Sequence, residues 1–161
     1  MQNKITTRQY KSHDAQDLAN IYYYTIHNVN IRDYSIEQVN AWAPSSSLEL
    51  VGWERKWDKL PPIVAVLDDV IVGFSEFEPN GHIDCFYVHH KFQGKGVGFS
   101  LMAEIEARAK LNDIQRIYAE VSITAKPFFE KQSFKVIKKQ NVNIRGCELT
   151  NFVMEKYIVL S

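Results

Sequence analysis

The pattern of hydrophobic and polar positions divides the chain into a mainly helical first third and a strand-rich remainder. Residues 4–10 alternate as in a short strand, and apolar residues then recur every three or four positions. Asp14 can cap the first helix, and Ser35, followed three residues later by Gln38, indicates the start of a second. Pro44 must end that second helix. The predicted helices cover residues 14–29, 35–43 and 48–60, with a loop at residues 43–47.

The period changes to two at residue 63, where strands begin. Asp68-Asp69 and Asn80-Gly81 are typical of tight turns between antiparallel strands. An amphipathic helix then starts inside a glycine-rich turn, and its predicted apolar face consists of Val97, Leu101, Met102, Ile105 and Ala109. The predicted strands cover residues 63–68, 70–78, 82–89, 116–122, 134–142 and 148–160, and a short helix covers residues 125–131.

This order of elements predicts an α/β or α+β fold, with helices on the faces of one sheet. The length is that of a single domain over residues 1–161, which is enough for a sizeable core. The composition, 45% hydrophobic and 24% charged, is that of an ordinary globular protein. We expect neither a membrane span nor a signal peptide, because no apolar run has the required length or position.

Charge and cysteine content argue against several classes of function. The chain has 19 basic and 19 acidic residues, so its net charge gives no reason to expect nucleic acid or a membrane surface as a partner. Cys85 and Cys147 fit no metal-ligand spacing and no disulfide framework. We therefore expect no metal and a reducing, cytoplasmic location. The sequence is compatible with a monomer and with a homodimer.

Three glycines within five residues predict a site for an anion. Gly94, Gly96 and Gly98 lie between a predicted strand and the start of a predicted helix. Glycine lets the backbone approach a ligand closely, and a helix N-terminus presents free N–H groups and the positive end of its dipole. Lys95 can add charge at the rim. The pattern favours a phosphate group, but it fits neither of the glycine motifs typical of nucleotide sites.

The motif Gln93-Gly94-Lys95-Gly96-Val97-Gly98 resembles the acetyl-CoA motif of the GNAT N-acetyltransferases, Gln/Arg-x-x-Gly-x-Gly/Ala. The strand ending in Tyr87-Val88-His89 and the segment 125–134 are also similar to this family. The resemblance implies a mixed, mostly antiparallel sheet of about seven strands that splays between the fourth and fifth, with helices on both faces. It also implies acetyl-CoA as cosubstrate, bound by Phe86, Tyr87, Val88, Gln93, Gly94, Lys95, Gly96, Val97, Gly98, Ser122 and Phe129.

Acetyl transfer to an amine needs a base that removes the amine proton. On a regular strand His82, Asp84 and Phe86 share one face. Ile83 and Cys85 then share the other, where Cys85 is a small core residue. By resemblance, His82 lies where histone acetyltransferases of this family carry a general-base glutamate. We therefore expect His82 and Asp84 on the basic side of catalysis. The alternative for His82 is a solvated position at the rim of the sheet.

The tyrosine that usually serves this family as general acid is absent, because Phe129 stands at its position. Ser122 could relay the proton instead, or it could cap the following helix. The same two interpretations apply to Thr124. Glu76 and Glu78, which share a face of their strand, are either additional bases in the cleft or part of a solvated face.

Aromatic residues are concentrated in the first helices, which in this family cover the acceptor cleft. Tyr22, Tyr23 and Tyr24 cannot all point inward, and we expect Tyr23 and Trp42 to line the acceptor site. The sequence shows no acidic cluster suited to a polycation, which favours a small amine or amino-acid-like acceptor.

These observations lead to one hypothesis and one alternative. The hypothesis is an N-acetyltransferase that moves acetyl from acetyl-CoA to a primary amine of a small-molecule or peptide acceptor by direct transfer. The alternative is a non-catalytic acyl-CoA-binding sensor of the same fold, because Phe129 replaces the usual acid. The two differ in whether any amine is acetylated once acetyl-CoA is bound.

Overall fold

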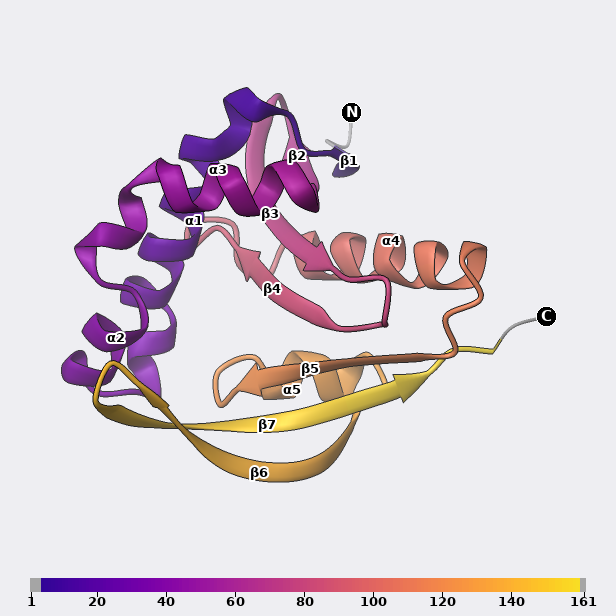
Figure 1. The fold of residues 1–161 in the computed structure, drawn as a ribbon. Helices are drawn as coiled ribbons and strands as arrows, with labels where there is room; N and C mark the ends of the chain where they lie inside the picture. Colours follow the sequence, from indigo (N-terminus) through magenta and orange to yellow (C-terminus); the bar gives the residue numbers. More distant parts are fainter. Residues whose placement is uncertain (1–3, 160–161) are drawn as a thin grey trace.

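The computed structural model describes residues 4–159, which contain seven strands and five α-helices (Figure 1). The strands are β1 (Thr6–Gln9), β2 (Ile63–Leu67), β3 (Val70–Phe77), β4 (Ile83–Val88), β5 (Arg116–Ser122), β6 (Lys135–Ile144) and β7 (Cys147–Tyr157). The helices are α1 (Ala15–Asn28), α2 (Ile36–Trp42), α3 (Leu50–Lys59), α4 (Val97–Leu111) and α5 (Lys126–Lys131). Short 3-10 segments cover Ser12–Asp14, Asn30–Arg32 and Ser45–Leu48, the last of them largely within the predicted loop. The predicted end of the last strand, residue 160, lies outside the described residues, as do the two ends of the predicted domain.

The strands form two antiparallel sheets that meet at one end. Within residues 4–159, β1-β2-β3-β4 form one sheet and β5-β7-β6 form the other. In the same residues one parallel bridge, between His82 and Tyr118, joins the sheets. A 3.0 Å hydrogen bond from the Tyr118 N–H to the Gly81 carbonyl reinforces it. Beyond the bridge β4 and β5 diverge (Figure 1). The predicted splay between the fourth and fifth strands is confirmed.

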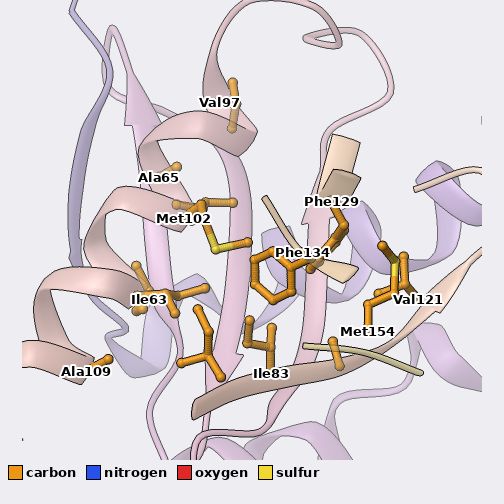
Figure 2. Close-up of a cluster of buried hydrophobic side chains, with 14 of the residues drawn as sticks. Ile63, Ala65, Ile83, Val97, Met102, Ala109, Val121, Phe129, Phe134 and Met154 are labelled. Carbon is orange, nitrogen blue, oxygen red and sulfur yellow. The ribbon is translucent and has the colours of Figure 1, made fainter. Parts of the chain in front are cut away.

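Helices cover both faces of the first sheet, with α4 on one face and α1 and α3 on the other (Figure 1). The predicted apolar face of α4 is confirmed, because Val97, Leu101, Met102, Ile105 and Ala109 are each at most 1% exposed. Figure 2 shows how this face packs on side chains of both sheets, among them Ile83, Val121 and Met154. On the other face, Trp57 of α3 packs against Phe74 of β3. Within the part of the chain that the structure describes, no helix has the length and apolarity needed to span a membrane.

The start of α2 is as predicted, and that of α1 is different. Ser35 Oγ accepts a hydrogen bond from the Gln38 N–H, and the Gln38 side chain accepts one from the Ser35 N–H. Asp14 does not cap α1 in this way, because the 3-10 segment Ser12–Asp14 precedes the helix. Its buried carboxylate instead pairs with Arg8, with Oδ2 2.7 Å from Nη1. Asp14 therefore ties the start of α1 to β1.

A bulge in β4 changes which of its side chains share a face. Opposite Glu76, β4 has one residue more than β3, so the regular alternation stops there. Asp84 and Cys85 both lie beside Glu76 as a result. Ile83 and Phe86 both contact the core under α4. The predicted grouping of Asp84 with Phe86 is therefore wrong, and so is that of Ile83 with Cys85.

The junction of the two sheets depends on Gly81, which has a φ of +95°. A Cβ at this position would lie 2.1 Å from the Arg116 carbonyl oxygen. We expect Gly81→Ala to lower the free energy of unfolding by about 2–5 kcal/mol, from the left-handed backbone and the overpacking together. Urea denaturation followed by far-UV circular dichroism measures this loss.

Gly52→Ala is the matched control for this substitution. Gly52 lies in α3, and a Cβ there would have no neighbour within 4 Å. Alanine should stabilise the helix by up to about 1 kcal/mol. A loss at Gly81→Ala no larger than the change at Gly52→Ala would contradict a structural role for Gly81.

Candidate active site

A cavity of about 460 Å³ lies where β4 and β5 diverge. Its walls come from these strands, the turn before α4, the first part of α5, and the end of α1 with α2. The predicted site residues that line it are Trp42, Asp84, Phe86, Tyr87, Val88, Gln93, Gly94, Gly96, Val97, Gly98, Ser122 and Phe129. Of the described residues that were predicted, Tyr23, His82 and Lys95 do not line it.

The glycine turn presents bare backbone to this cavity. Gly94 and Gly96 have φ values of +72° and +87°, and a Cβ on either would meet no atom within 4 Å. Gly96 is the N-cap of α4 and makes no side-chain cap. The first N–H groups of the helix are therefore free to bind an anion. Lys95 is exposed and does not line the cavity, so the predicted charge at the cavity rim is absent from this part of the described chain.

The end of β4 joins this turn to the rest of the cavity. The Val88 carbonyl accepts hydrogen bonds from Gln93 Nε2 at 2.8 Å and from Thr25 Oγ1 at 3.0 Å. Phe86 packs against Phe128 and Phe129, with ring centroids 5.4 Å apart in each case. The apolar wall on this side is thus formed by β4 and α5 together.

The residues expected to supply a proton differ in their contacts. Phe129 is 2% exposed and is part of the core beneath the cavity. Ser122 Oγ accepts hydrogen bonds from the Ala125 N–H at 3.0 Å and from Asn30 Nδ2 at 3.4 Å. This favours the capping interpretation of Ser122. Thr124 Oγ1 is buried and has no hydrogen-bond partner among the described residues, although Thr124 lines the cavity.

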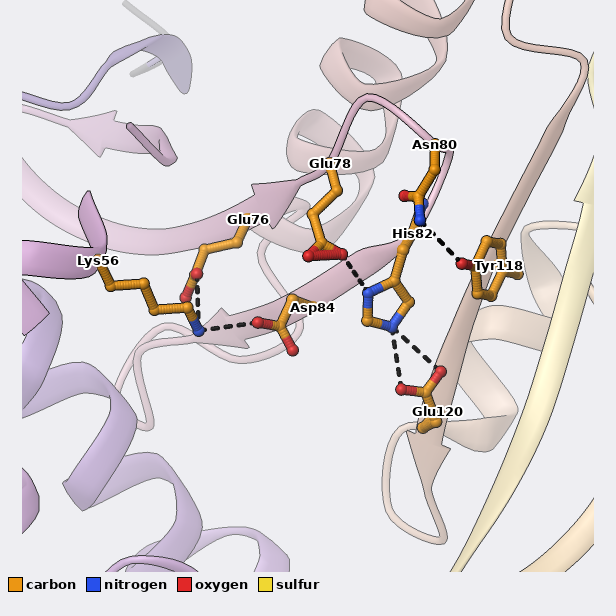
Figure 3. Close-up of polar contacts among 8 residues, drawn as sticks. All are labelled: Lys56, Glu76, Glu78, Asn80, His82, Asp84, Tyr118 and Glu120. Carbon is orange, nitrogen blue, oxygen red and sulfur yellow. Dashed lines mark hydrogen bonds and ion pairs between the residues drawn. The ribbon is translucent and has the colours of Figure 1, made fainter. Parts of the chain in front are cut away.

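His82 lies between the carboxylates of Glu78 and Glu120 (Figure 3) and is not part of the cavity lining. Its Nδ1 contacts Glu78, and its Nε2 is 2.9 Å from Oε1 of Glu120. Burial acts to lower the pKa of His82, but the two carboxylates outweigh it, so the pKa is raised. Glu120 lines the cavity where His82 does not. The imidazole therefore holds Glu120 in place, and Glu120 is the group that faces the cavity.

A second cluster of charged residues, formed by Lys56, Glu76 and Asp84, lies further along β4 (Figure 3). Lys56 Nζ is 2.9 Å from Oε1 of Glu76 and 2.7 Å from Oδ2 of Asp84. Burial acts to lower the pKa of Lys56, but the surrounding acidic groups outweigh it and raise that pKa. Cys85 lies beside Glu76 and Asp84 and is a core residue, as predicted. Burial raises the pKa of its thiol. Glu76 is 1% exposed, so it belongs neither to a solvated face nor to the cavity lining.

The predicted acceptor residues separate in the structure. Trp42 lines the cavity, and its ring packs edge-on against Tyr34. Tyr23 stacks on His27 instead, with ring centroids 4.1 Å apart. Tyr22 packs between Trp53 and Tyr87. Of the aromatic residues in the first helices, Trp42 is therefore the one that reaches the cavity.

Two charged residues in or beside the cavity, Glu120 and Lys56, were not predicted. Glu120 interrupts an apolar strand just as Asp84 does, and that was a usable signal. Lys56 gave no signal, because its partners lie on strands further along the chain. The expectation that the site lacks an acidic cluster is wrong, because the fold brings Glu120 of β5 close to the carboxylates of Glu76, Glu78 and Asp84, which lie at least 36 residues earlier in the sequence.

The sequence and the fold both match known acetyltransferases. Residues 30–156 match the family described as the acetyltransferase (GNAT) domain. YafP of Escherichia coli (strain K12), described as an uncharacterized N-acetyltransferase, is 32% identical over 153 residues, which cover 94% of this chain and 95% of YafP. A GCN5-related N-acetyltransferase from Rhodopseudomonas palustris has a TM-score of 0.91 at 29% identity, over 98% of this chain and 99% of that one. PaiA N-acetyltransferase from Thermoplasma acidophilum, solved with coenzyme A, shares the fold with a TM-score of 0.73 at 19% identity, over 96% and 99% of the two chains.

The contacts of His82 make its titration a test of this geometry. We expect its pKa, measured by NMR, to lie above the usual value of about 6.5 and to fall in both Glu78→Gln and Glu120→Gln. Because the pKa of His82 is raised on folding, its protonation stabilises the fold. This stabilisation is fully present at pH values below the pKa of His82 in the unfolded state. This contribution is lost as the pH rises through the folded value. A His82 pKa at the usual value, or one that Glu120→Gln leaves unchanged, would contradict the contacts of His82 with the two carboxylates.

Proposed function

The chain belongs to the GNAT family of acetyltransferases and is an acyltransferase, and on that premise we propose that it moves an acetyl group from acetyl-CoA to a primary amine of a small molecule or peptide. The observation that carries the proposal is the cavity between β4 and β5. Free backbone N–H groups lie beside it at the N-terminus of α4, and Asp84 and Glu120 lie near the junction of the sheets.

The described residues fit acetyl-CoA, which supplies the acetyl group as a thioester. Gly94 and Gly96 leave open space where a pyrophosphate would contact the backbone. The apolar strip formed by Phe86, Phe128 and Phe129 suits the body of a pantetheine arm. Thr124 Oγ1, buried and without a hydrogen-bond partner among residues 4–159, is a candidate hydrogen-bonding group for the cosubstrate. The complex of PaiA with coenzyme A supports the same kind of ligand for this chain.

We assign the role of general base to Glu120 rather than to His82. Glu120 faces the cavity and is 42% exposed, so it can reach an acceptor ammonium. His82 is 15% exposed, and both of its ring nitrogens contact carboxylates. Glu120 would take a proton from the acceptor, whose nitrogen then attacks the acetyl carbon. His82 is the positioning residue that orients this carboxylate.

The leaving thiolate needs a proton, and Phe129 cannot give one. Thr124 Oγ1 makes no hydrogen bond within the described residues, neither as donor nor as acceptor, so its hydroxyl is available to donate. Ser122 is less suited, because its hydroxyl caps the turn before α5. A sensor without turnover would need the glycine turn but not a carboxylate held open to the cavity by an imidazole. The position of Glu120 therefore favours the enzyme.

Binding of the cosubstrate can be tested at the glycine turn. We expect Gly96→Glu to abolish binding of coenzyme A in isothermal titration calorimetry, because the side chain would fill the open space with a negative charge. Gly146→Glu is the matched control, since Gly146 has a similar φ of +85° and an equally open position in the β6–β7 turn. Equal binding by both variants would place the phosphate groups elsewhere.

The role of the base can be tested separately. We expect Glu120→Gln to lower kcat with an amine acceptor by about 10²–10⁴-fold and to leave the Kd for coenzyme A unchanged. Glu104→Gln removes the same charge from α4, where Glu104 pairs with Arg108, and should keep full activity. A thiol-release assay with acetyl-CoA measures both. A kcat for Glu120→Gln within a few-fold of the native value would exclude Glu120 as the base.

A further inference from the structure

The charges around the cavity restrict the acceptor. Asp84 and Glu120 are the charged residues of the cavity lining, and within residues 4–159 no lysine or arginine lines it. Asp84 on β4 and Glu120 on β5 lie on the same side of the gap between these two strands. Ala119 and Val121, the neighbours of Glu120, face the core under α4, so Glu120 points away from that core. Asp84 likewise points toward Lys56 on α3.

The nearby cations do not reverse this charge. Lys56 is held between Asp84 and the buried Glu76, and His82 is held between Glu120 and Glu78 (Figure 3). Four carboxylates thus face one ammonium and one imidazole, and two of these carboxylates, Asp84 and Glu120, line the cavity. The group is negative even when His82 is protonated.

Arg145 contacts the end of α2, where Trp42 lines the cavity, but points its guanidinium at backbone carbonyls. Arg145 donates a 2.7 Å hydrogen bond to the Ala41 carbonyl at the end of α2. Arg145 itself is not part of the cavity lining in the described chain. An acceptor that brought a carboxylate next to its amine would therefore meet Asp84 and Glu120, with no lysine or arginine among the described lining residues to pair with it.

We infer that the acceptor is a primary amine with no carboxylate on the carbon next to the nitrogen, and that Asp84 is a residue that determines this specificity. Free α-amino acids are excluded by charge, whereas simple alkylamines, lysine side chains and peptide N-termini are not. The inference rests on the proposed function. It replaces the broader expectation of an amino-acid-like acceptor. The neutral wall of Trp42, Tyr87 and Val29 accepts an apolar body on such an amine.

Phenylethylamine and phenylalanine form a matched pair of probes, because they differ by one carboxylate and have amines of similar basicity. With saturating acetyl-CoA, we expect kcat/KM in a thiol-release assay to be at least about tenfold higher for phenylethylamine, as a like-charge contact near a protein surface requires. Asp84→Asn removes one cavity carboxylate and frees one side of Lys56. It should reduce this ratio at least about fivefold, whereas Asp58→Asn, on the exposed side of α3, should leave the ratio unchanged.

Each outcome decides the inference. A ratio near one in the native protein, or one that Asp84→Asn does not change, overturns it while the acetyltransferase activity stands. If neither phenylethylamine nor phenylalanine is acetylated, their binding is measured by calorimetry on the protein loaded with coenzyme A. There, tighter binding of phenylethylamine than of phenylalanine supports the inference, and equal, reversed or absent binding overturns it. The proposed function fails by a different result, which is binding of acetyl-CoA without acetylation of any amine, whether small or peptide.

Discussion

The contact between the Gly81–His82 segment and Tyr118 is the constraint on which the site depends. It fixes β4 and β5 together at one end, with the Tyr118 N–H bonded to the Gly81 carbonyl. Each strand then pairs with its own sheet and not with the other, so unpaired backbone faces the gap. Such backbone groups need hydrogen-bond partners. A ligand with amide groups along its length can supply them, and the α4 N-terminus lies at the open end for its charge.

The bulge in β4 has a second effect on the same site. A regular strand would have placed Asp84 beside Phe86, over the core under α4, where an unpaired carboxylate is costly. The extra residue instead turns Asp84 toward Lys56 and Glu76. One irregularity therefore separates an apolar surface for the cosubstrate from a charged surface for the acceptor.

Much of the fold could be predicted from local patterns, and much of the site could not. The glycine turn, the stripe on α4 and the cap at Ser35 are properties of neighbouring residues, so the sequence shows them directly. The role of His82 depends on Glu120, which lies on another strand, and no local pattern connects the two. The face to which Asp84 points depends on a one-residue register shift that periodicity cannot detect. Long-range pairing and strand irregularity are what the sequence left undetermined.

The cosubstrate and acceptor sides of the cavity are built from different parts of the chain. At the glycine turn the contacts come from backbone N–H groups, which most substitutions leave unchanged as long as Gly94 and Gly96 keep their φ values. On the acceptor side, the contacts come from side chains such as Asp84, Glu120 and Trp42. During evolution, descendants of this chain can therefore acquire new acceptors through a few side-chain replacements on β4, β5 and α2 while continuing to use the same acyl donor.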